Sequence, residues 1–271
     1  MGLSVRSEGD YEMAALSNRK AVKILAFGDS WLSNPGSNSS FSIAKSIAGN
    51  FDVIIYSMTM AGKETAQSLS KGGLEALLKK YENHNRDERQ KFDVVLVSAG
   101  GSDIIEKGEL KKLIFDKNDI KDVSQDIEQY IDKTALNTKI KSIISLYEEI
   151  ISRLIKINSD VKIITHNYGI AAYMKKGTRM LGIPVGGSWI ESCFTEKNIT
   201  DGKIQKDVFK YIFTQLSGGL ISLQKKYSGN FKVIETQRLI QENDWKDEIH
   251  LTSAGCEKIA KEIYNEGIAK R

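Results

Sequence analysis

The sequence has few cysteines and no long apolar segment, and each of these shortages excludes a class of protein. Cys193 and Cys256 are its only cysteines, and they do not have the short spacing of a metal-ligand pair. This argues against a zinc site and against a disulfide framework, and it fits a reducing, intracellular setting. No run of about 18 apolar residues occurs, so we expect no transmembrane segment.

Two further absences concern targeting and nucleic acid. Residues 1–20 lack the apolar core of a signal peptide, which predicts a cytoplasmic protein and leaves export by a dedicated secretion system open. The net charge of +4 is spread along the chain over both signs, without a basic stripe of the kind that binds nucleic acid. No nucleic-acid partner is therefore expected, and the oligomeric state is left open.

Five short apolar runs have the length and the β-branched content of buried strands. Stretches with helical periodicity separate them, the clearest at residues 138–157 and 204–227. Strands that alternate with helices pair in parallel, with helices on both faces of the sheet. The sequence thus predicts a three-layer α/β/α sandwich with about five parallel strands. The predicted strands are residues 23–27, 52–57, 92–98, 161–165 and 231–235.

The predicted organisation is a loose N-terminal tail over residues 1–20, followed by one domain over residues 21–271. Two excursions interrupt the alternation of strands and helices. Residues 106–135 are charged and mixed, and residues 170–202 are rich in glycine. Long irregular loops of this kind often carry function, so we expect both excursions to flank the cleft and to tune specificity.

Residues with reactive side chains follow the predicted strands. In parallel sheets the carboxyl ends of the strands meet at one edge, where loops build the active site. Ser30 ends a Gly28-Asp29-Ser30 turn after the first strand, which is suitable for a nucleophile, although such a turn is often only structural. No Gly-x-Gly-x-x-Gly or Walker-type Gly-Lys-Ser/Thr motif is present, which argues against a nucleotide-binding domain.

The three histidines differ in their sequence context. His84 lies in a polar stretch that predicts a solvated surface position. His250 follows Asp247 by three residues just before the last predicted helix, so the pair could act as a base and its orienting acid, or simply as a histidine bonded to an Asp cap. His166 and Asn167 follow the fourth strand, where they could either line a substrate pocket or cap strand ends.

Four blocks of the sequence, in this order, resemble the blocks of SGNH or GDSL-type hydrolases. They are Gly28-Asp29-Ser30, the glycine turn at Gly62, Gly100-Gly101-Ser102-Asp103, and Asp247-Glu248-Ile249-His250. The flanking Trp31, Trp189 and Trp245 resemble a bacterial branch with a GDSW signature. The resemblance implies a flavodoxin-like topology and a serine esterase with Ser30 as nucleophile, His250 as base and Asp247 as its partner. It implies an ester of a small molecule, lipid or carbohydrate as substrate, with neither metal nor cofactor.

The resemblance also implies an oxyanion hole, in which this chain departs from the family pattern. Ser30 and Gly62 match the two backbone donors, whereas Ser102 stands where the family has asparagine. Either Ser102 reaches the substrate, or a water or a residue such as Asn167 replaces the donor, or the protein is a weakened hydrolase. The alternative function is accordingly a ligand- or partner-binding protein with this fold. Asp29 is expected to support the site, and Asp103 to bond backbone groups that hold the catalytic loops. Trp31 and Trp189 are expected either to form an apolar substrate wall or to pack in the core.

Overall fold

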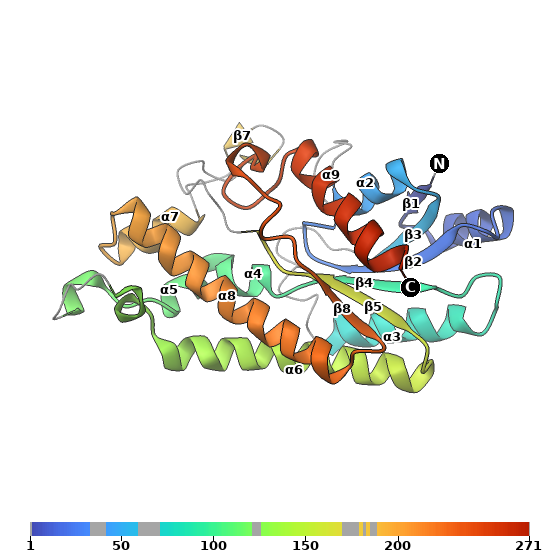
Figure 1. Cartoon of the computed structure of the whole chain (residues 1–271), viewed down its shortest axis with the longest axis horizontal. Coiled ribbons are helices and arrows are strands. Elements are labelled where there is room, and N and C mark those ends of the chain that lie inside the picture. Colours follow the sequence, from blue (N-terminus) through green and yellow to red (C-terminus); the bar gives the residue numbers. More distant parts are fainter. Residues whose placement is uncertain are drawn as a thin grey trace.

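The computed structural model describes residues 2–32, 42–58, 71–120, 126–169, 179–180, 183–184 and 189–270. At its centre is a parallel sheet of six strands in the order β1-β3-β2-β4-β5-β8 (Figure 1). The order of β3, β2, β4, β5 and β8 along the sheet matches a doubly wound α/β fold. The strands are β1 (Leu3–Val5), β2 (Val22–Gly28), β3 (Val53–Ser57), β4 (Val94–Ser98), β5 (Lys162–His166) and β8 (Phe231–Ile234).

The five predicted strands are confirmed as β2, β3, β4, β5 and β8. Their apolar runs are continuous rather than alternating because helices cover both faces of the sheet. In β4 all five residues are buried, and in β2 every residue after Val22 is buried. The predicted sandwich is therefore present, with one more strand than the sequence suggests.

The sixth strand and a helix occupy the N-terminal segment, so the predicted loose tail is wrong there. β1 pairs in parallel with β3, and α1 (Glu8–Ser17) follows it with Ser7 as its N-cap. Tyr11 anchors α1, since its ring is fully buried and its hydroxyl donates to the Gln90 carbonyl at 2.6 Å. The sequence pattern hardly indicates these two elements, because β1 has only three residues and α1 buries only Tyr11 and Ala15.

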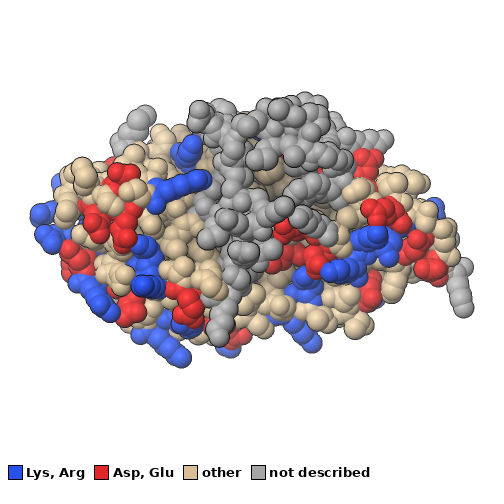
Figure 2. Space-filling view, turned by 180° about the vertical axis from the view of Figure 1, so that it is seen from behind, with Lys and Arg blue, Asp and Glu red and all other residues tan. Residues whose placement is uncertain are grey.

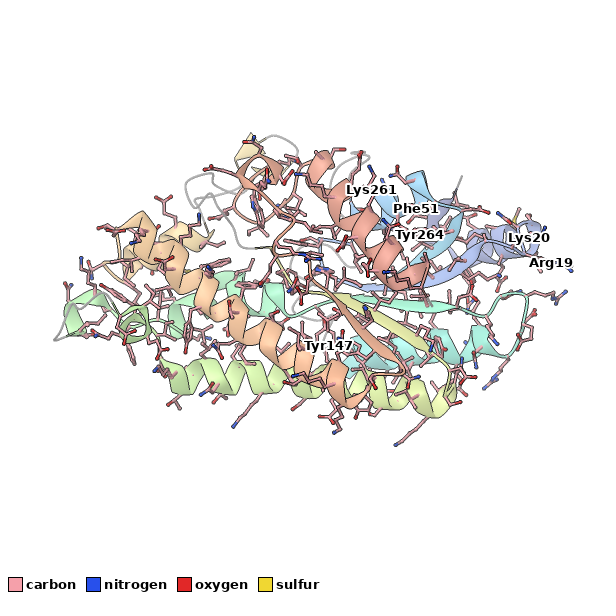
Figure 3. All side chains as sticks on the ribbon, viewed as in Figure 1. Arg19, Lys20, Phe51, Tyr147, Lys261 and Tyr264 are labelled. Carbon is pink, nitrogen blue, oxygen red and sulfur yellow. The ribbon has the colours of Figure 1, made fainter. Side chains whose placement is uncertain are left out.

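Helices cover both faces of the sheet. α2 and α9 pack together above it in Figure 1, and α3 and α6 pack together below it, with α8 against α6. Phe51, at the end of α2, stacks on Tyr264 of the π-helical turn Ile263–Ile268 with ring centroids 3.6 Å apart (Figure 3). The helices are α2 (Ile43–Asn50), α3 (Lys71–Asn85), α6 (Lys133–Ile157), α8 (Gly202–Lys226) and α9 (Ser253–Glu262).

Both excursions contain short elements. The first, which α4 (Gly101–Ile105) immediately precedes, carries the short helical turn Glu106–Gly108 and α5 (Glu109–Lys112), and an isolated bridge joins Ile114 to Ile131. The second carries the two-stranded hairpin of β6 (Arg179–Met180) and β7 (Ile183–Pro184), then α7 (Trp189–Glu196).

Surface charge and helix hydropathy bear on possible partners. Lysine and arginine are interspersed with aspartate and glutamate over the face shown in Figure 2, with no continuous basic stripe among its described residues. Within the described ranges, no helix combines the length and the hydropathy needed to cross a membrane.

Candidate active site

The turn that carries Ser30 depends on a glycine at the end of β2. Gly28 has φ of +145° and pairs with Ser98 of β4. A Cβ at this position would lie 1.9 Å from the Ser98 carbonyl oxygen, and the next residue, Asp29, donates its N–H to that same oxygen at 2.8 Å. Only glycine has both the dihedral freedom and the small size that this close approach needs.

Asp29 is fully buried behind Ser30 and holds three separate segments together. Its carboxylate accepts hydrogen bonds from the Ser98 hydroxyl at 2.8 Å, from the Trp31 backbone N–H at 3.1 Å and from the Tyr168 hydroxyl. Burial raises the pKa of Asp29, and these bonds only partly oppose that effect. Asp29 therefore fixes the turn on which Ser30 lies, half-buried, at the carboxyl edge of the sheet.

His250 and Asp247 form a hydrogen-bonded pair on the loop before α9. The Nδ1 atom of His250 lies 2.9 Å and 3.1 Å from the two carboxylate oxygens of Asp247. Because a carboxylate accepts, Nδ1 donates and Nε2 is left with its lone pair. Asp247 is buried, which by itself would raise its pKa. The bond and charge of His250 and the backbone N–H groups of His250 and Ile249 outweigh burial and lower that pKa.

Trp31 connects the two halves of the site. Its indole Nε1 donates to the Ile249 carbonyl at 3.1 Å, so the residue after Ser30 is bonded to the residue before His250. The Trp31 ring stacks on the buried ring of His166 with centroids 5.4 Å apart and contacts Trp245 edge-on. These contacts place the serine turn beside the histidine loop.

A pocket opens beside Ser30, and its lining is mostly apolar. Ser102, in the first turn of α4, also lies on its wall, as does the buried Glu248, whose Oε2 accepts from the Ile190 N–H at 3.0 Å. Ile190 of the second excursion lines the pocket, as does Ile105, which immediately precedes the first excursion. The remaining lining residues are Asp29, Trp31, Gly101, Tyr168, Gly169, Phe209, Phe213, Trp245 and Ile249.

His166 and Asn167 are buried and do not belong to the pocket lining. Burial lowers the pKa of His166 to about 4, and its Nε2 lies 2.9 Å from the Ser98 hydroxyl, which in turn bonds Asp29. The Asn167 amide donates to the Ser217 hydroxyl at 3.1 Å and accepts from the Thr236 N–H at 2.7 Å. Asn167 is thus committed to fixing strand ends, and the idea that it replaces the missing oxyanion donor is wrong.

The other predicted site residues have different outcomes. The buried Oδ2 of Asp103 has no hydrogen-bond partner among the described residues, so the expected backbone bonds to this oxygen are not found there. Burial, followed by the nearby charge of Asp29, raises the pKa of Asp103 to about 6. Gly62 and the side chain of Trp189 lie outside the described residues.

Two tyrosines at the site were not expected from the sequence. Tyr168 bonds Asp29 and lines the pocket. Tyr147 of α6 donates to the Ala99 carbonyl at 2.9 Å and accepts from the Ala99 N–H at 3.1 Å, which holds the turn before Ser102. The position of Tyr168 just after β5 was a usable signal, whereas Tyr147 is one of many residues on an amphipathic helix.

Comparison with known proteins finds similarity in structure only. No family model matches the chain, and no curated protein matches its sequence. Among solved structures, the lipase Lip_vut3 from a goat rumen metagenome matches with a TM-score of 0.54 at 13% identity, over 91% of this chain and 98% of that one. Phospholipase A1 from Streptomyces albidoflavus matches with a TM-score of 0.51 at 11% identity, over 91% and 100%.

A GDSL-like lipase from Bacteroides ovatus matches with a TM-score of 0.52 at 13% identity, over 92% of this chain and 53% of that one. At identities this low, the structural similarity establishes the fold alone, and the activity must be argued from the residues of the site. The described sheet, its strand order and these neighbours agree, and the chain has the fold of the SGNH hydrolases, to which GDSL-type lipases and esterases belong.

Proposed function

We propose that this protein is a serine esterase that hydrolyses carboxylic esters through an acyl-Ser30 intermediate. The observation that carries the proposal is the His250–Asp247 pair, which the Trp31–Ile249 hydrogen bond ties to the turn that holds Ser30. A nucleophile, a base whose second ring nitrogen carries a lone pair and a buried carboxylate that orients the base are the three groups that acyl transfer to serine requires.

In the proposed reaction, the Ser30 hydroxyl oxygen attacks the ester carbonyl carbon while His250 Nε2 accepts the hydroxyl proton. Asp247 keeps the proton of Nδ1 in place and stabilises the imidazolium. The tetrahedral intermediate collapses, His250 gives its proton to the leaving alkoxide, and an alcohol departs. Water then attacks the acyl-serine with the same base, which releases the carboxylic acid and restores Ser30.

The developing oxyanion needs donors beside Ser30. We propose the backbone N–H groups of Ser30 and Gly62, as the family resemblance implies, together with the Ser102 hydroxyl. The position of Ser102 on the pocket wall, in the first turn of α4, supports this role. A serine hydroxyl is shorter than the carboxamide that the family pattern has here, so we expect a modest turnover.

The pocket suggests the substrate class. Its wall carries the aromatic side chains of Phe209, Phe213 and Trp245 and the aliphatic side chains of Ile105 and Ile190. An apolar wall favours an apolar acyl group over a charged group, because the acyl group loses contact with water on binding. The cavity has a volume of about 20 Å³, so we propose esters with a short apolar acyl group.

The direct test is labelling with a fluorophosphonate, which reacts with an activated serine. We expect the wild-type protein to be labelled and Ser30→Ala not to be. Asp247→Asn should be labelled much more slowly, since it loses the carboxylate that orients His250. Ser222→Ala, on the exposed side of α8, is the matched control and should be labelled like the wild type. Equal labelling of Ser30→Ala and wild type would refute the role of Ser30.

A ligand- or partner-binding protein is the second candidate, and Ser102 in the asparagine position is the observation that favours it. Under this hypothesis the folded protein would bind an apolar ester or acid in the pocket without turnover. Absence of both labelling and ester hydrolysis, in a protein with normal thermal unfolding, would favour binding over catalysis.

A further inference from the structure

A second cluster of polar residues lies between α1 and α3, where His84 of α3 faces Glu8 and Glu12 of α1. The sequence predicts a solvated His84, but only 3% of this residue is exposed in the structure. Its ring packs against the rings of Tyr11 and Phe92, each with centroids 5.2 Å away. Such burial of an imidazole calls for a polar partner on each ring nitrogen.

One ring nitrogen of His84 has that partner and the other does not. Nδ1 lies 3.1 Å from the Lys80 carbonyl oxygen, which can only accept, so Nδ1 is the donor. In the neutral ring Nε2 then carries a lone pair that needs a partner. Nε2 is buried and has no hydrogen-bond partner among the described residues.

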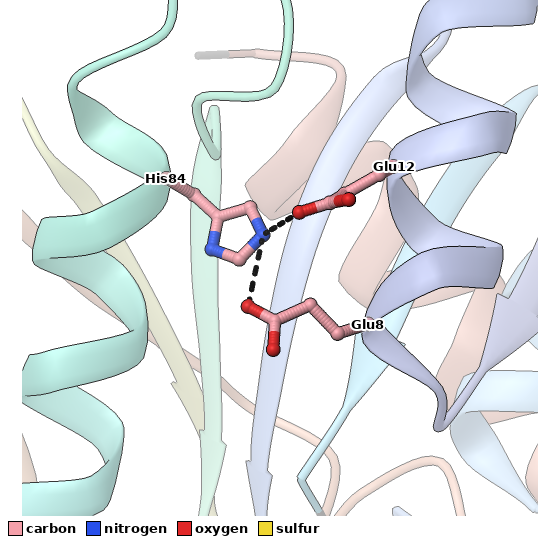
Figure 4. Close-up of side chains that lie close together, drawn as sticks. All are labelled: Glu8, Glu12 and His84. Carbon is pink, nitrogen blue, oxygen red and sulfur yellow. Dashed lines mark ion pairs between the residues drawn. The ribbon is translucent and has the colours of Figure 1, made fainter.

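Nε2 is directed at two carboxylates of α1, as Figure 4 shows. It lies 3.7 Å from Oε1 of Glu8 and 4.0 Å from Oε1 of Glu12, beyond hydrogen-bond distance. Glu8 and Glu12 are one turn apart on the helix, so their side chains leave the same face. Nε2 of His84 and one carboxylate oxygen each of Glu8 and Glu12 all lie within 4.8 Å of one another, so three acceptor atoms surround one point.

We propose that Glu8, Glu12 and His84 form a binding site for a divalent transition-metal ion, with Zn²⁺ as the best fit. Zn²⁺ takes imidazole nitrogen and carboxylate oxygen at about 2.0–2.2 Å, which puts two such ligand atoms about 3.4 Å apart in tetrahedral geometry. The separations from His84 Nε2 to the Glu8 and Glu12 oxygens are 3.7 Å and 4.0 Å, and the two carboxylate oxygens lie within 4.8 Å of each other, so the carboxylates must move closer together to bind one ion. Glu8 and Glu12 can close that gap because their side chains are 48% and 44% exposed.

The surroundings of His84 suit a metal ligand. Metal-binding imidazoles commonly donate their second ring nitrogen to a carbonyl, which fixes the ring, and here the Lys80 carbonyl has that position. A water would complete four coordination. None of the three residues lines the pocket beside Ser30, so this site is independent of the proposed esterase function.

Lys80 is the competitor for the site. Its Nζ lies 2.7 Å from the same Glu8 oxygen that faces His84, so a metal must share or displace this contact. Removing the ammonium group while keeping the alkyl chain should therefore strengthen metal binding. Because α1 follows the edge strand β1, the bound ion would fasten the N-terminal strand and helix onto α3 and stabilise the folded chain.

The experiment uses the full chain after treatment with a chelator. Zn²⁺ is titrated while thermal unfolding is followed, and Co²⁺ is used as a spectroscopic probe of tetrahedral coordination. We expect one Zn²⁺ per chain, a melting temperature that rises with Zn²⁺ concentration, and visible Co²⁺ absorption bands. Glu8→Gln, at an exposed position, and Glu12→Gln, at a partly exposed one, should both fold and should weaken binding by roughly 10- to 100-fold or more.

Asp10→Asn is the matched control, since it removes one negative charge from α1 outside the cluster and should bind like the wild type. Lys80→Met should bind Zn²⁺ more tightly than the wild type. The proposal is overturned if Zn²⁺ changes neither the melting temperature nor the Co²⁺ spectrum. It is equally overturned if Glu8→Gln and Glu12→Gln bind like Asp10→Asn. Fluorophosphonate labelling of Ser30 should not depend on Zn²⁺, so the two proposals can fail separately.

Discussion

The indole nitrogen of Trp31 lies 3.1 Å from the carbonyl oxygen of Ile249, and this single contact joins residues 218 positions apart in the chain. Trp31 follows Ser30, and Ile249 precedes His250. One hydrogen bond inside an aromatic cluster therefore links the turn of the proposed nucleophile to the loop of the proposed base. Small displacements of catalytic groups are costly, which makes this contact a sensitive point of the site.

Trp31→Phe should lower kcat for ester hydrolysis by roughly 10- to 100-fold, because the donor to Ile249 is lost and the histidine loop is released. Trp245→Phe is a matched control in the same pocket, since the Trp245 Nε1 is buried without a hydrogen-bond partner among the described residues. Steady-state kinetics of both variants, with melting temperatures, measures the effect. Equal losses in both would mean that pocket volume, and not the Trp31 hydrogen bond, is responsible.

Ser102→Asn should raise kcat on a short-chain ester by about 10- to 100-fold, because a carboxamide extends farther toward the oxyanion than a hydroxyl. Ser102→Ala should be slower than the wild type, since it removes the remaining donor. The measurement is initial rate against ester concentration for the three proteins. An unchanged or lower rate in Ser102→Asn would show that this position does not limit catalysis.

Asp103→Asn should stabilise the protein at neutral pH. Burial and the charge of Asp29 raise the pKa of Asp103 from 3.8 to about 6 in the folded state, so the folded chain binds a proton more tightly than the unfolded chain. Stability then falls as pH rises from about 4 to 6, by up to about 3 kcal/mol above that window. The neutral asparagine avoids this cost, and its advantage should disappear below about pH 4.

Urea unfolding of wild type and Asp103→Asn between pH 4 and pH 8 tests this linkage. Asp160→Asn, at an exposed position, is the control and should follow the wild type throughout. A difference between Asp103→Asn and wild type that does not change with pH would argue against a shifted Asp103 titration.

Gly28→Ala should destabilise the fold by at least about 3 kcal/mol, since it combines a positive φ with a backbone clash at the centre of the sheet. The added Cβ would lie 1.9 Å from the Ser98 carbonyl oxygen. Gly218→Ala in α8 is the opposite case, because its Cβ would meet no atom within 4 Å. There we expect a gain of about 0.4–1 kcal/mol in the free energy of unfolding, measured by chemical denaturation.

Several features of the fold follow from local sequence alone. Within the predicted strands 23–27 and 92–98, the uninterrupted apolar residues 24–27 and 94–97 predict buried parallel strands, because both faces of such a sheet exclude water. Parallel strands end at one edge, so the positions of Ser30 and Ser102 after their strands bring both residues to the pocket beside that edge. The pairing of Asp247 with His250 is also local, since three residues separate them.

Tertiary structure decided the features whose partners lie far apart in the sequence. The edge strand β1 exists because β3 offers it backbone partners, and three residues carry no pattern of their own. The sequence predicts a solvated His84 and leaves open whether His166 and Asn167 line a pocket or cap strand ends, and all three residues are buried. Their burial depends on contacts with distant segments, as in the bond from Asn167 to Ser217. Local sequence thus determined the strands and the order of the reactive residues, whereas three-dimensional packing decided which polar groups face the pocket and which support it.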